Sequence, residues 1–502
     1  MASDKFRQQL QQEMEQWRSQ GIISADQARQ LAERYEFSQL DGMARDRFVT
    51  VVLGIGSVLL GLGVITFVAA NWQAIPRELK LLLLLLLFVG VNVTGFYLWS
   101  QPPLPDRQES GRQRLGQGLL LLGALILGAN LALMGQMFHI NGSSADLCIV
   151  WGFAVLGMAY GLRLTSLGAL AIFLVGIGFW NGISGWDWNN PPSDAVRWVI
   201  RQMPLIAGLS FIPLGYWCRS KWVFGLGAIA SLSALLVLLL RFSDTFPPSS
   251  NFYGIWLVLI FTLPTAILWS YDDRLWQRLF SRFTSESPLA SETPLRSETL
   301  LGSETAYFRS IAQGLALLCG MVVIYVLSFH YAWEDSRVVA PPTAQAEGLM
   351  TAGLSLLLNP SLLFFVGLTV VQWIYLARPR RLGRWGLSQS NSMMLAFLGA
   401  IAALTFWHWT IEPIGAIATF FSNVLLFLLA VALMRDGLAD GQRRIFWSGL
   451  ALVTLQILSR LLEYETALLL KSVVFLLCGV GVMVIGLWFE RYVRTLRIAS
   501  ED

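Results

Sequence analysis

Stretches of about 20 apolar residues recur along most of this chain, separated by short polar segments. A helix rises 1.5 Å per residue, so about 20 apolar residues cross the hydrocarbon core of a bilayer. In lipid every backbone polar group needs an internal partner, and a helix supplies one within a single segment. The sequence therefore predicts an all-α fold, a polytopic transmembrane helical bundle of about 14 helices with a small N-terminal cytoplasmic helical hairpin.

The predicted spans lie near residues 48–70, 79–99, 115–137, 146–162, 164–183, 200–217, 222–240, 252–270, 308–330, 355–377, 392–410, 413–434, 445–462 and 468–489. The composition agrees, because 55% of the residues are hydrophobic and only 14% are charged. A soluble domain has about 25% charged residues. The net charge of +4 is small, and the basic residues of the chain form no array that could follow a phosphate backbone. No nucleic-acid partner is therefore expected.

The distribution of basic residues predicts the orientation of the spans. With the N-terminus in the cytoplasm, 28 of the 36 Lys and Arg residues fall on the cytoplasmic side. This bias follows the positive-inside rule and persists to the C-terminus, which favours an even number of spans. We therefore expect a protein integral to a prokaryotic inner or internal membrane, with both termini cytoplasmic.

The polar segments divide the chain into predicted parts. These are a cytoplasmic helical hairpin at 1–46, a first membrane module at 47–271, a cytoplasmic Ser/Glu-rich tether at 272–306, a second membrane module at 307–491 and a cytoplasmic tail at 492–502. Within the tether a six-residue repeat rich in Ser, Glu and Pro runs from 285 to 305. Such a composition cannot bury a core, so it predicts a flexible connection.

Local signals predict two structural details. Gly21 is placed to end the first hairpin helix, and Ser24 with Gln27 fits a capping box that begins the second. The hairpin has too little core to be stable alone, so we expect it to bind a protein partner, a second copy or the cytoplasmic loops. In the third span Ala124, Gly128 and Ala132 form a face of small residues that lets helices approach closely.

Polar residues inside a membrane are costly and therefore indicate candidate sites. The candidates are Asn71, Gln117, Asn130, Gln136, His139, Asp146, Arg460, Glu463 and Lys471. Arg460 and Glu463 are three residues apart on one helix, a spacing that predicts an ion pair. The alternative is an anion site that uses Arg460 with Lys471.

The sequence contains no motif for catalysis, a cofactor or a metal. Walker A, G-x-S-x-G, H-E-x-x-H and Rossmann patterns are all absent. The four cysteines form no C-x-x-C pair, and the three histidines, at 139, 330 and 408, have no metal-ligand spacing. We therefore expect no catalytic residue, cofactor or metal.

Several motifs resemble those of one prokaryotic family. The stretch Ala69–Pro76 resembles the end of the first span in the membrane proteins of domain-of-unknown-function family 2157, and Gly135–Gly142 with Asp146 and Trp151 resembles the same family. The hairpin residues Trp17 and Gly21 are similar to its opening. The resemblance covers about residues 1–185, whereas 456–490 is more weakly similar to the ends of related multi-span proteins. It implies membership but no activity, and it favours the motif residues as candidates for any site.

The sequence is compatible with three kinds of function. The span count and the intramembrane polar residues favour a transporter or permease of a small solute or lipid. The hairpin and tether favour a non-catalytic membrane scaffold, assembly factor or sensor. An intramembrane enzyme at the outer face is the least favoured, and it would use residues such as His139, Asp146, Glu334, Asp335, His408 and Glu412.

Overall fold

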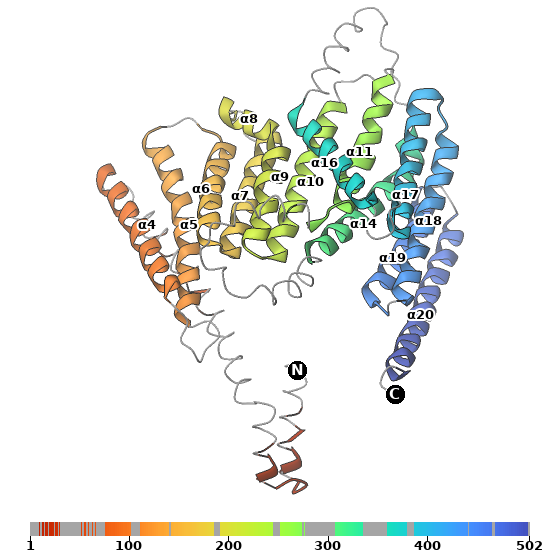
Figure 1. Cartoon of the computed structure of the whole chain (residues 1–502), viewed down its shortest axis with the longest axis horizontal. Helices are drawn as coiled ribbons and strands as arrows, with labels where there is room; N and C mark the ends of the chain where they lie inside the picture. Colours follow the sequence, from red (N-terminus) through yellow and green to blue (C-terminus); the bar gives the residue numbers. More distant parts are fainter. Residues whose placement is uncertain are drawn as a thin grey trace, which may run out of the picture. The chain divides into compact units, whose positions relative to one another are not determined.

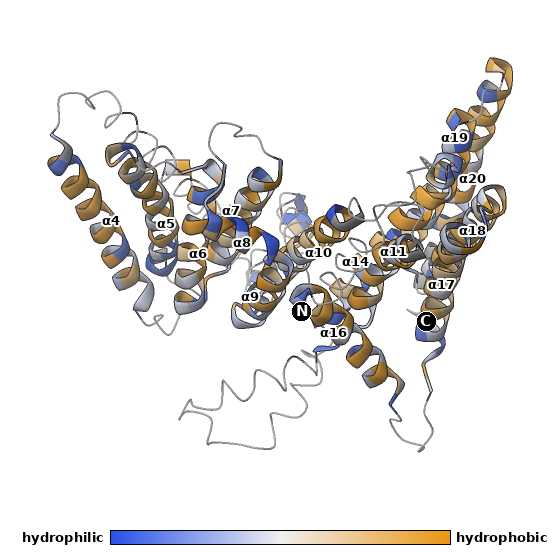
Figure 2. Ribbon diagram, turned by 90° about the horizontal axis from the view of Figure 1, so that it is seen from above, coloured by the Kyte–Doolittle hydropathy of each residue, from blue (hydrophilic) through white to orange (hydrophobic). Residues whose placement is uncertain are grey.

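The computed structural model describes residues 76–101, 111–139, 142–184, 191–243, 251–273, 307–334, 359–378, 386–439, 441–463 and 467–499, with single positions elsewhere, among them part of 10–30. Every regular element in these residues is a helix, which confirms the predicted all-α class (Figure 1). Most of the helices are hydrophobic over the greater part of their length, as Figure 2 shows.

The helices of the described residues match the predicted spans closely. Eleven of them are long and apolar enough to cross a membrane, or up to 12 if α8 (Asp194–Arg201) and α9 (Met203–Trp217) form one broken span. A further helix, α11 (Asn251–Trp269), is apolar but shorter over Tyr253–Trp269. The predicted span at 48–70 lies outside the described residues apart from single positions. The bundle is therefore polytopic, as expected.

Contacts divide the chain into two compact units, Met1–Ile200 and Arg201–Asp502. Unit 1 contains α4 (Arg77–Ser100), α5 (Gly111–Met137), α6 (Ser144–Leu162), α7 (Thr165–Ser184) and most of α8. In this unit α5 packs against α4 and α6, and α6 packs against α7. The predicted division into modules around a tether at 272–306 stays a prediction.

The small-residue face of α5 packs against a tryptophan of α6. The indole Nε1 of Trp151 donates a hydrogen bond to the carbonyl of Ala124 at 2.8 Å. A Cβ atom on Gly128 would lie 2.3 Å from the Trp151 ring, so only glycine fits there. The small residues of this face therefore accommodate the aromatic ring of a neighbouring helix, whereas the predicted close approach of two helix backbones at this face stays a prediction.

Unit 2 contains the larger set of helices. They are α9, α10 (Lys221–Ser243), α11, α14 (Tyr307–Leu327), α16 (Pro360–Ala377), α17 (Gln389–Phe406), α18 (Gly415–Ala439), α19 (Arg443–Glu463) and α20 (Leu468–Ala499). Helix α11 contacts α10, α14, α16 and α17, and α18 contacts both α14 and α19. The core of unit 2 therefore centres on α11, α14 and α18.

Capping residues fix several helix starts. The Asn359 side chain accepts hydrogen bonds from the backbone N–H groups of Ser361 and Leu362, and Pro360 occupies the first helical position of α16. The Ser388 hydroxyl accepts a hydrogen bond from the Asn391 N–H at the start of α17. These residues satisfy N–H groups that lack partners within the helix.

The predicted turn of the N-terminal hairpin is present in the described residues. Gly21 has a positive φ of 71°, and the Ile22 N–H donates to the Trp17 carbonyl at 2.9 Å. The Ser24 N–H donates to Gln27 Oε1 at 2.9 Å, and the Gln27 N–H donates to the Ser24 hydroxyl. The glycine C-cap and the capping box are both confirmed.

Candidate functional site

The nine residues predicted for a polar membrane site are distributed over both units. Asn71 lies outside the described residues. Unit 1 holds five of them: Gln117, Asn130 and Gln136 on α5, His139 beyond its end, and Asp146 on α6. Unit 2 holds Arg460 and Glu463 on α19 and Lys471, half-buried, in the first turn of α20. Their role in binding a ligand stays a prediction.

The polar residues of α5 have different surroundings. The Asn130 Nδ2 donates to the Leu84 carbonyl of α4 at 3.4 Å, so this amide joins two neighbouring helices. Gln117 is half-buried, whereas Gln136 and His139 are exposed. His139 has a positive φ of 50° and lies where the helix ends. The structure therefore assigns Asn130 to a helix contact and leaves Gln136 and His139 on the surface.

Asp146 organises the start of α6. Its Oδ2 accepts hydrogen bonds from the backbone N–H and the hydroxyl of Ser143, at 2.8 and 2.7 Å, and the Ser143 hydroxyl accepts one from the Asp146 N–H. Its Oδ1 also accepts hydrogen bonds from the N–H and the hydroxyl of Ser193, at 3.0 and 2.6 Å. Asp146 thus caps one helix and joins it to the segment that precedes α8.

Arg460 pairs with Glu463, as their spacing predicted, and it also contacts the end of α14. Its guanidinium forms an ion pair with Glu463 and donates to the Ser328 carbonyl at 2.6 Å. It also lies over the Phe329 ring, with 4.2 Å from Cζ to the ring centroid, a favourable cation–π distance. The two charged side chains are 19% and 13% exposed, so the pair is mostly buried.

Neighbouring amides extend this network. The Asn423 Nδ2 donates to the Ser328 carbonyl at 2.9 Å, and the Gln456 Nε2 donates to Asn423 Oδ1 at 3.1 Å. Glu463 accepts a hydrogen bond from the His330 N–H at 2.6 Å. These hydrogen bonds join α18, α19 and the residues after α14 in one network, which indicates a structural contact between helices, although Ser422 Oγ and Arg460 Nε are buried without a hydrogen bond.

His408 is the buried histidine of unit 2. It is 1% exposed in the π-helical turn η2 (Trp407–Ile411) and its ring lies edge-on to Trp333, with centroids 5.2 Å apart. Its Nδ1 accepts a hydrogen bond from the Ile414 N–H at 3.0 Å. This contact fixes the connection between η2 and α18.

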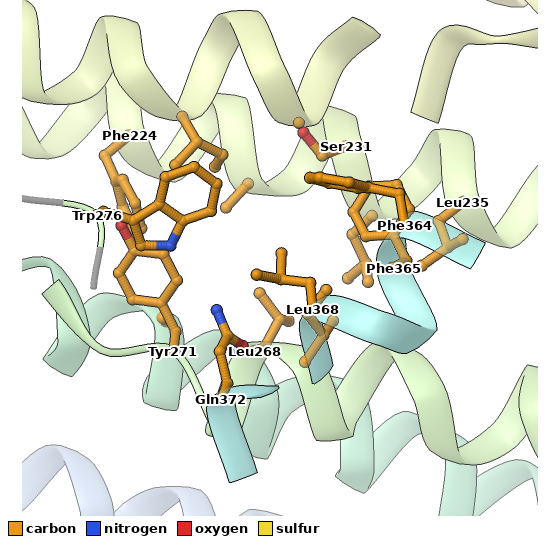
Figure 3. A pocket seen from close by; sticks show the side chains of 16 residues that line it. Phe224, Ser231, Leu235, Leu268, Tyr271, Trp276, Phe364, Phe365, Leu368 and Gln372 are labelled. Carbon is orange, nitrogen blue, oxygen red and sulfur yellow. The ribbon is translucent and has the colours of Figure 1, made fainter. Parts of the chain in front are cut away.

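The sequence reasoning missed a cavity in unit 2. It has a volume of about 60 Å³ and is bounded by α9, α10, α11, α14 and α16. Apolar side chains form nearly all of its wall, with Phe224, Tyr271 and Trp276 at one end and Phe364 and Phe365 at the other (Figure 3). Apolar walls with few polar groups are typical of ligand sites in proteins.

One amide group faces this cavity. Gln372 of α16 is 1% exposed, and its Oε1 lies 2.9 Å from the Ser270 hydroxyl, which donates to it. Its Nε2 is buried without a hydrogen-bond partner and points toward the cavity (Figure 3), but it has less than 1 Å² of accessible surface. A buried N–H without an acceptor costs about 1–3 kcal/mol. The wall of the cavity therefore contains a buried polar group that lacks a hydrogen-bond partner.

A hydrogen-bonded cluster adjoins the end of the cavity at Tyr271. The Tyr216 hydroxyl lies 2.5 Å from the Tyr271 hydroxyl and donates to Asp273. Asp273 accepts a hydrogen bond from the Arg309 N–H at 3.0 Å, and Arg309 lies 3.8 Å from Asp272. Burial raises the pKa of both Asp273 and Tyr271 above their ordinary values. The Tyr271 ring thus forms a cavity wall while its hydroxyl belongs to a charged cluster.

Part of this site had a signal in the sequence. Gln372 is an amide within an apolar span, which is the same signal that selected Asn130. Its pairing with Ser270 joins residues far apart in the sequence, and no local pattern reports such a contact. The cavity itself is formed by the packing of five helices. The sequence could therefore indicate Gln372 as a candidate residue, but it could not indicate the residues that surround it.

Comparison with known proteins agrees with the membrane class. The family described as "Predicted membrane protein (DUF2157)" matches residues 15–168, which confirms the resemblance seen in the motifs. No curated protein and no solved structure matches the chain. The matched region includes Asn130 and Asp146, whereas all residues that line the cavity lie beyond it.

Proposed function

With residues 15–168 identified as a DUF2157 region, from a family of predicted membrane proteins, we propose that this chain is an integral membrane protein whose unit 2 binds an apolar chain of the lipid class. The observation that carries the proposal is the apolar cavity with the buried, unpartnered Nε2 of Gln372 in its wall. The prokaryotic inner membrane and the cytoplasmic termini, inferred from the positions of Lys and Arg, form part of the proposal.

The apolar wall supports a hydrocarbon segment as the occupant of the cavity, and the volume limits its length. An engineered apolar cavity of about 150 Å³ holds benzene, so a cavity of about 60 Å³ holds neither a ring nor a whole lipid chain, only a short segment of one. Water is a poor occupant, because it needs two to four polar partners. The Tyr271 hydroxyl contacts Tyr216 and the Ser231 hydroxyl donates to the Gly227 carbonyl, so both already have partners.

The surrounding contacts support a binding or scaffold role over transport. Asn130, Asp146 and Arg460, which were candidates for a polar path, form contacts between secondary-structure elements. Such contacts hold helices in one arrangement. Transport of a solute or lipid stays a prediction, as does binding of a protein partner through the N-terminal hairpin.

Photolabelling tests the proposed function. The purified protein in nanodiscs would be labelled with a hexadecane chain that carries a diazirine, and labelled residues would be located by mass spectrometry. We expect label on buried cavity residues such as Ala228 and Leu235, besides label on lipid-facing residues such as Ile229. Label confined to lipid-facing residues would overturn the proposal.

Two variants separate the cavity from the general lipid surface. Ala228→Leu fills the cavity and should abolish label there, whereas Ala230→Leu, on the same helix but outside the cavity wall, should leave it unchanged. Leu368→Ala enlarges the cavity and should increase the label. Equal cavity labelling in all three variants would also contradict the proposal.

A further inference from the structure

Helix α20 packs mainly on α19, and a group of contacts closes one end of this helix pair. The Arg443 guanidinium at the start of α19 forms an ion pair with Glu490 of α20 at 2.7 Å. One turn further along α19, the Phe446 ring stacks on the Phe489 ring with 3.9 Å between the centroids. A salt bridge and an aromatic stack therefore hold the two helices together at this end.

The space between the two helices widens away from the closed end. A Cβ atom on Gly486 would lie 2.6 Å from the Trp447 ring, so α20 touches α19 there. Gly479 lies seven residues earlier, on the same face of α20. A Cβ atom on Gly479 would meet no atom within 4 Å. The helices therefore diverge between these two glycines.

A groove of about 290 Å³ lies in this space, separate from the cavity of Figure 3 and formed by other helices. Its wall consists mostly of apolar side chains, which are Trp447, Leu450, Ala451, Leu455 and Leu458 of α19 and Val482 of α20. The Thr454 hydroxyl in the same wall donates to the Leu450 carbonyl at 2.9 Å, so it already has a partner. The groove therefore favours a hydrocarbon occupant.

The length of the groove matches one leaflet of a bilayer. From Trp447 to Leu458, α19 rises about 16 Å. The hydrocarbon core of a bilayer is about 30 Å thick, so one leaflet contributes about 15 Å. A transmembrane helix of a partner would need a groove about twice as long, with small residues along it. An acyl chain that belongs to one leaflet therefore fits this groove better than a helix does.

Positive charge lies at the closed end of the groove. Arg443 and Arg444 precede Trp447 by four and three residues, so both lie on the groove face of α19, one turn before the apolar wall begins. Arg443 already faces Glu490, whereas Arg444 is exposed. On the topology proposed above this end is cytoplasmic, and basic groups between transmembrane helices on that side bind anionic lipid headgroups.

We propose that the groove between α19 and α20 binds an anionic phospholipid, with one acyl chain along the apolar wall and the phosphate against Arg444. The site goes beyond the proposed function, because it lies on a different surface and recognises a headgroup as well as a chain. Arg444 selects the charge of the lipid, and the apolar wall holds its chain.

Two matched photolabels test this proposal on the full chain in nanodiscs. They are phosphatidylglycerol and phosphatidylcholine with the same chains, one of which carries a diazirine. Mass spectrometry would locate the label on groove residues such as Leu455 and Val482. At equal concentrations we expect about fivefold more label in the groove from phosphatidylglycerol, which is the effect of about one arginine on an anionic lipid.

Arg444→Gln is the decisive variant for the headgroup. It should remove the preference for phosphatidylglycerol while phosphatidylcholine still labels the groove at its original level. Arg444→Lys keeps the charge and should retain most of the preference. Arg435→Gln, the same change at an exposed arginine near the end of α18, should retain all of it. Equal losses in Arg444→Gln and Arg435→Gln, or no loss in either, would overturn the proposal.

A second variant tests the position of the chain. Ala451→Phe fills the groove and should abolish label on Leu455 and Val482 from both lipids. Ala396→Phe, at an exposed position of α17, should leave this label unchanged. Equal labelling in these two variants would show that the label does not report the groove, which also overturns the proposal.

The remaining outcomes identify other occupants. Equal groove labelling by the two lipids in wild type would show that the groove does not select an anionic headgroup. An unlabelled groove together with a dimeric mass in native mass spectrometry would assign it to a second copy, and an unlabelled groove in a monomer would leave it without a lipid. Each of these results overturns the proposal. Label in the cavity of Figure 3 is located on other residues, so the proposed function can fail or succeed independently.

Discussion

The guanidinium of Arg460 donates a hydrogen bond to the carbonyl of Ser328 at 2.6 Å, which joins α19 to the end of α14 across 132 positions of sequence. The same guanidinium pairs with Glu463, so one side chain serves a local and a distant contact. The end of α14 is thereby held by a charged group that the chain places inside the bundle.

Arg460→Ala should be strongly destabilising. It leaves the mostly buried Glu463 without its cation, and breaking such a pair costs about 3–5 kcal/mol. Arg443→Ala is the matched control, because Arg443 and Glu490 are 53% and 41% exposed, and an exposed pair contributes at most about 1 kcal/mol. Chemical denaturation of both variants measures the difference, and equal losses would contradict the structural role of Arg460.

Gln372→Leu should cost little stability, unlike the loss of a satisfied amide. Ser270 keeps the Ala266 carbonyl as a partner, and the unpaired Nε2 disappears, so we expect a change within about 1 kcal/mol. Asn423→Leu should cost about 1–3 kcal/mol, because Asn423 donates to the carbonyls of Ser328 and Thr419. Unfolding of the delipidated protein measures both. A loss in Gln372→Leu as large as in Asn423→Leu would show that the amide is already satisfied.

Asp146→Ala should weaken the start of α6. The change removes the capping box with Ser143 and the acceptor for Ser193, at an expected cost of about 1–3 kcal/mol. Hydrogen exchange should increase in the first turn of α6. Asp194→Ala is the control, since Asp194 is 94% exposed in its pair with Arg197 and should contribute less than about 1 kcal/mol. Unchanged exchange in Asp146→Ala would refute the cap.

The stability of the protein should depend on pH through Asp273. Its pKa is raised by burial, so the folded state keeps the proton over a pH range in which the unfolded state has lost it. The neutral carboxyl of Asp273 therefore makes its full contribution to the free energy of unfolding below the ordinary pKa of aspartate. This contribution falls as the pH rises through the raised pKa. Asp273→Asn cannot ionise and should lack this decline.

Thermal unfolding of wild type and Asp273→Asn across acidic and neutral pH measures this effect. The difference in stability, wild type minus variant, should decrease with rising pH and then become constant. The neighbouring groups that face Asp273 are Asp272, Tyr216 and Arg309, and they are unchanged in the variant. A difference that grows with pH would show that the charged form is the stabilised one.

Gly437→Ala should disturb the contact between α18 and α19. A Cβ atom there would lie 2.4 Å from the Phe446 backbone nitrogen, so the helices must separate, at a typical overpacking cost of about 1–3 kcal/mol. Gly399→Ala on α17 meets no atom within 4 Å and should be neutral or stabilising by up to about 1 kcal/mol. The melting temperatures of the two variants test this contact. Equal melting temperatures would show that α18 and α19 do not approach closely at Gly437.

Local patterns in the sequence predicted those features that depend on neighbours along the chain. The apolar stretches predicted the helices, Gly21 and Ser24 predicted the hairpin turn, and spacing predicted the pair of Arg460 and Glu463. Each of these depends on residues within a few turns of helix or on the length of one apolar segment.

Distant contacts could not be predicted in this way. Gln372 contacts Ser270, Tyr216 contacts Asp273, and Glu463 contacts the His330 backbone, each across more than 50 positions. Helix packing decides such pairs, and a single sequence contains no direct record of it. The role of the nine candidate residues in a site therefore stays a prediction, and apart from the pair of Arg460 and Glu463 neither their partners nor the cavity could be predicted.

The hydrogen bond from the Arg309 N–H to Asp273 connects two residues that are 36 positions apart in the sequence. It joins the start of α14 to the end of α11 and so closes a loop that contains the six-residue repeat. The entropy of closing a flexible loop grows only with the logarithm of its length, about 0.6 kcal/mol for each doubling. Adding or removing one repeat should therefore change the free energy of unfolding by less than about 0.6 kcal/mol.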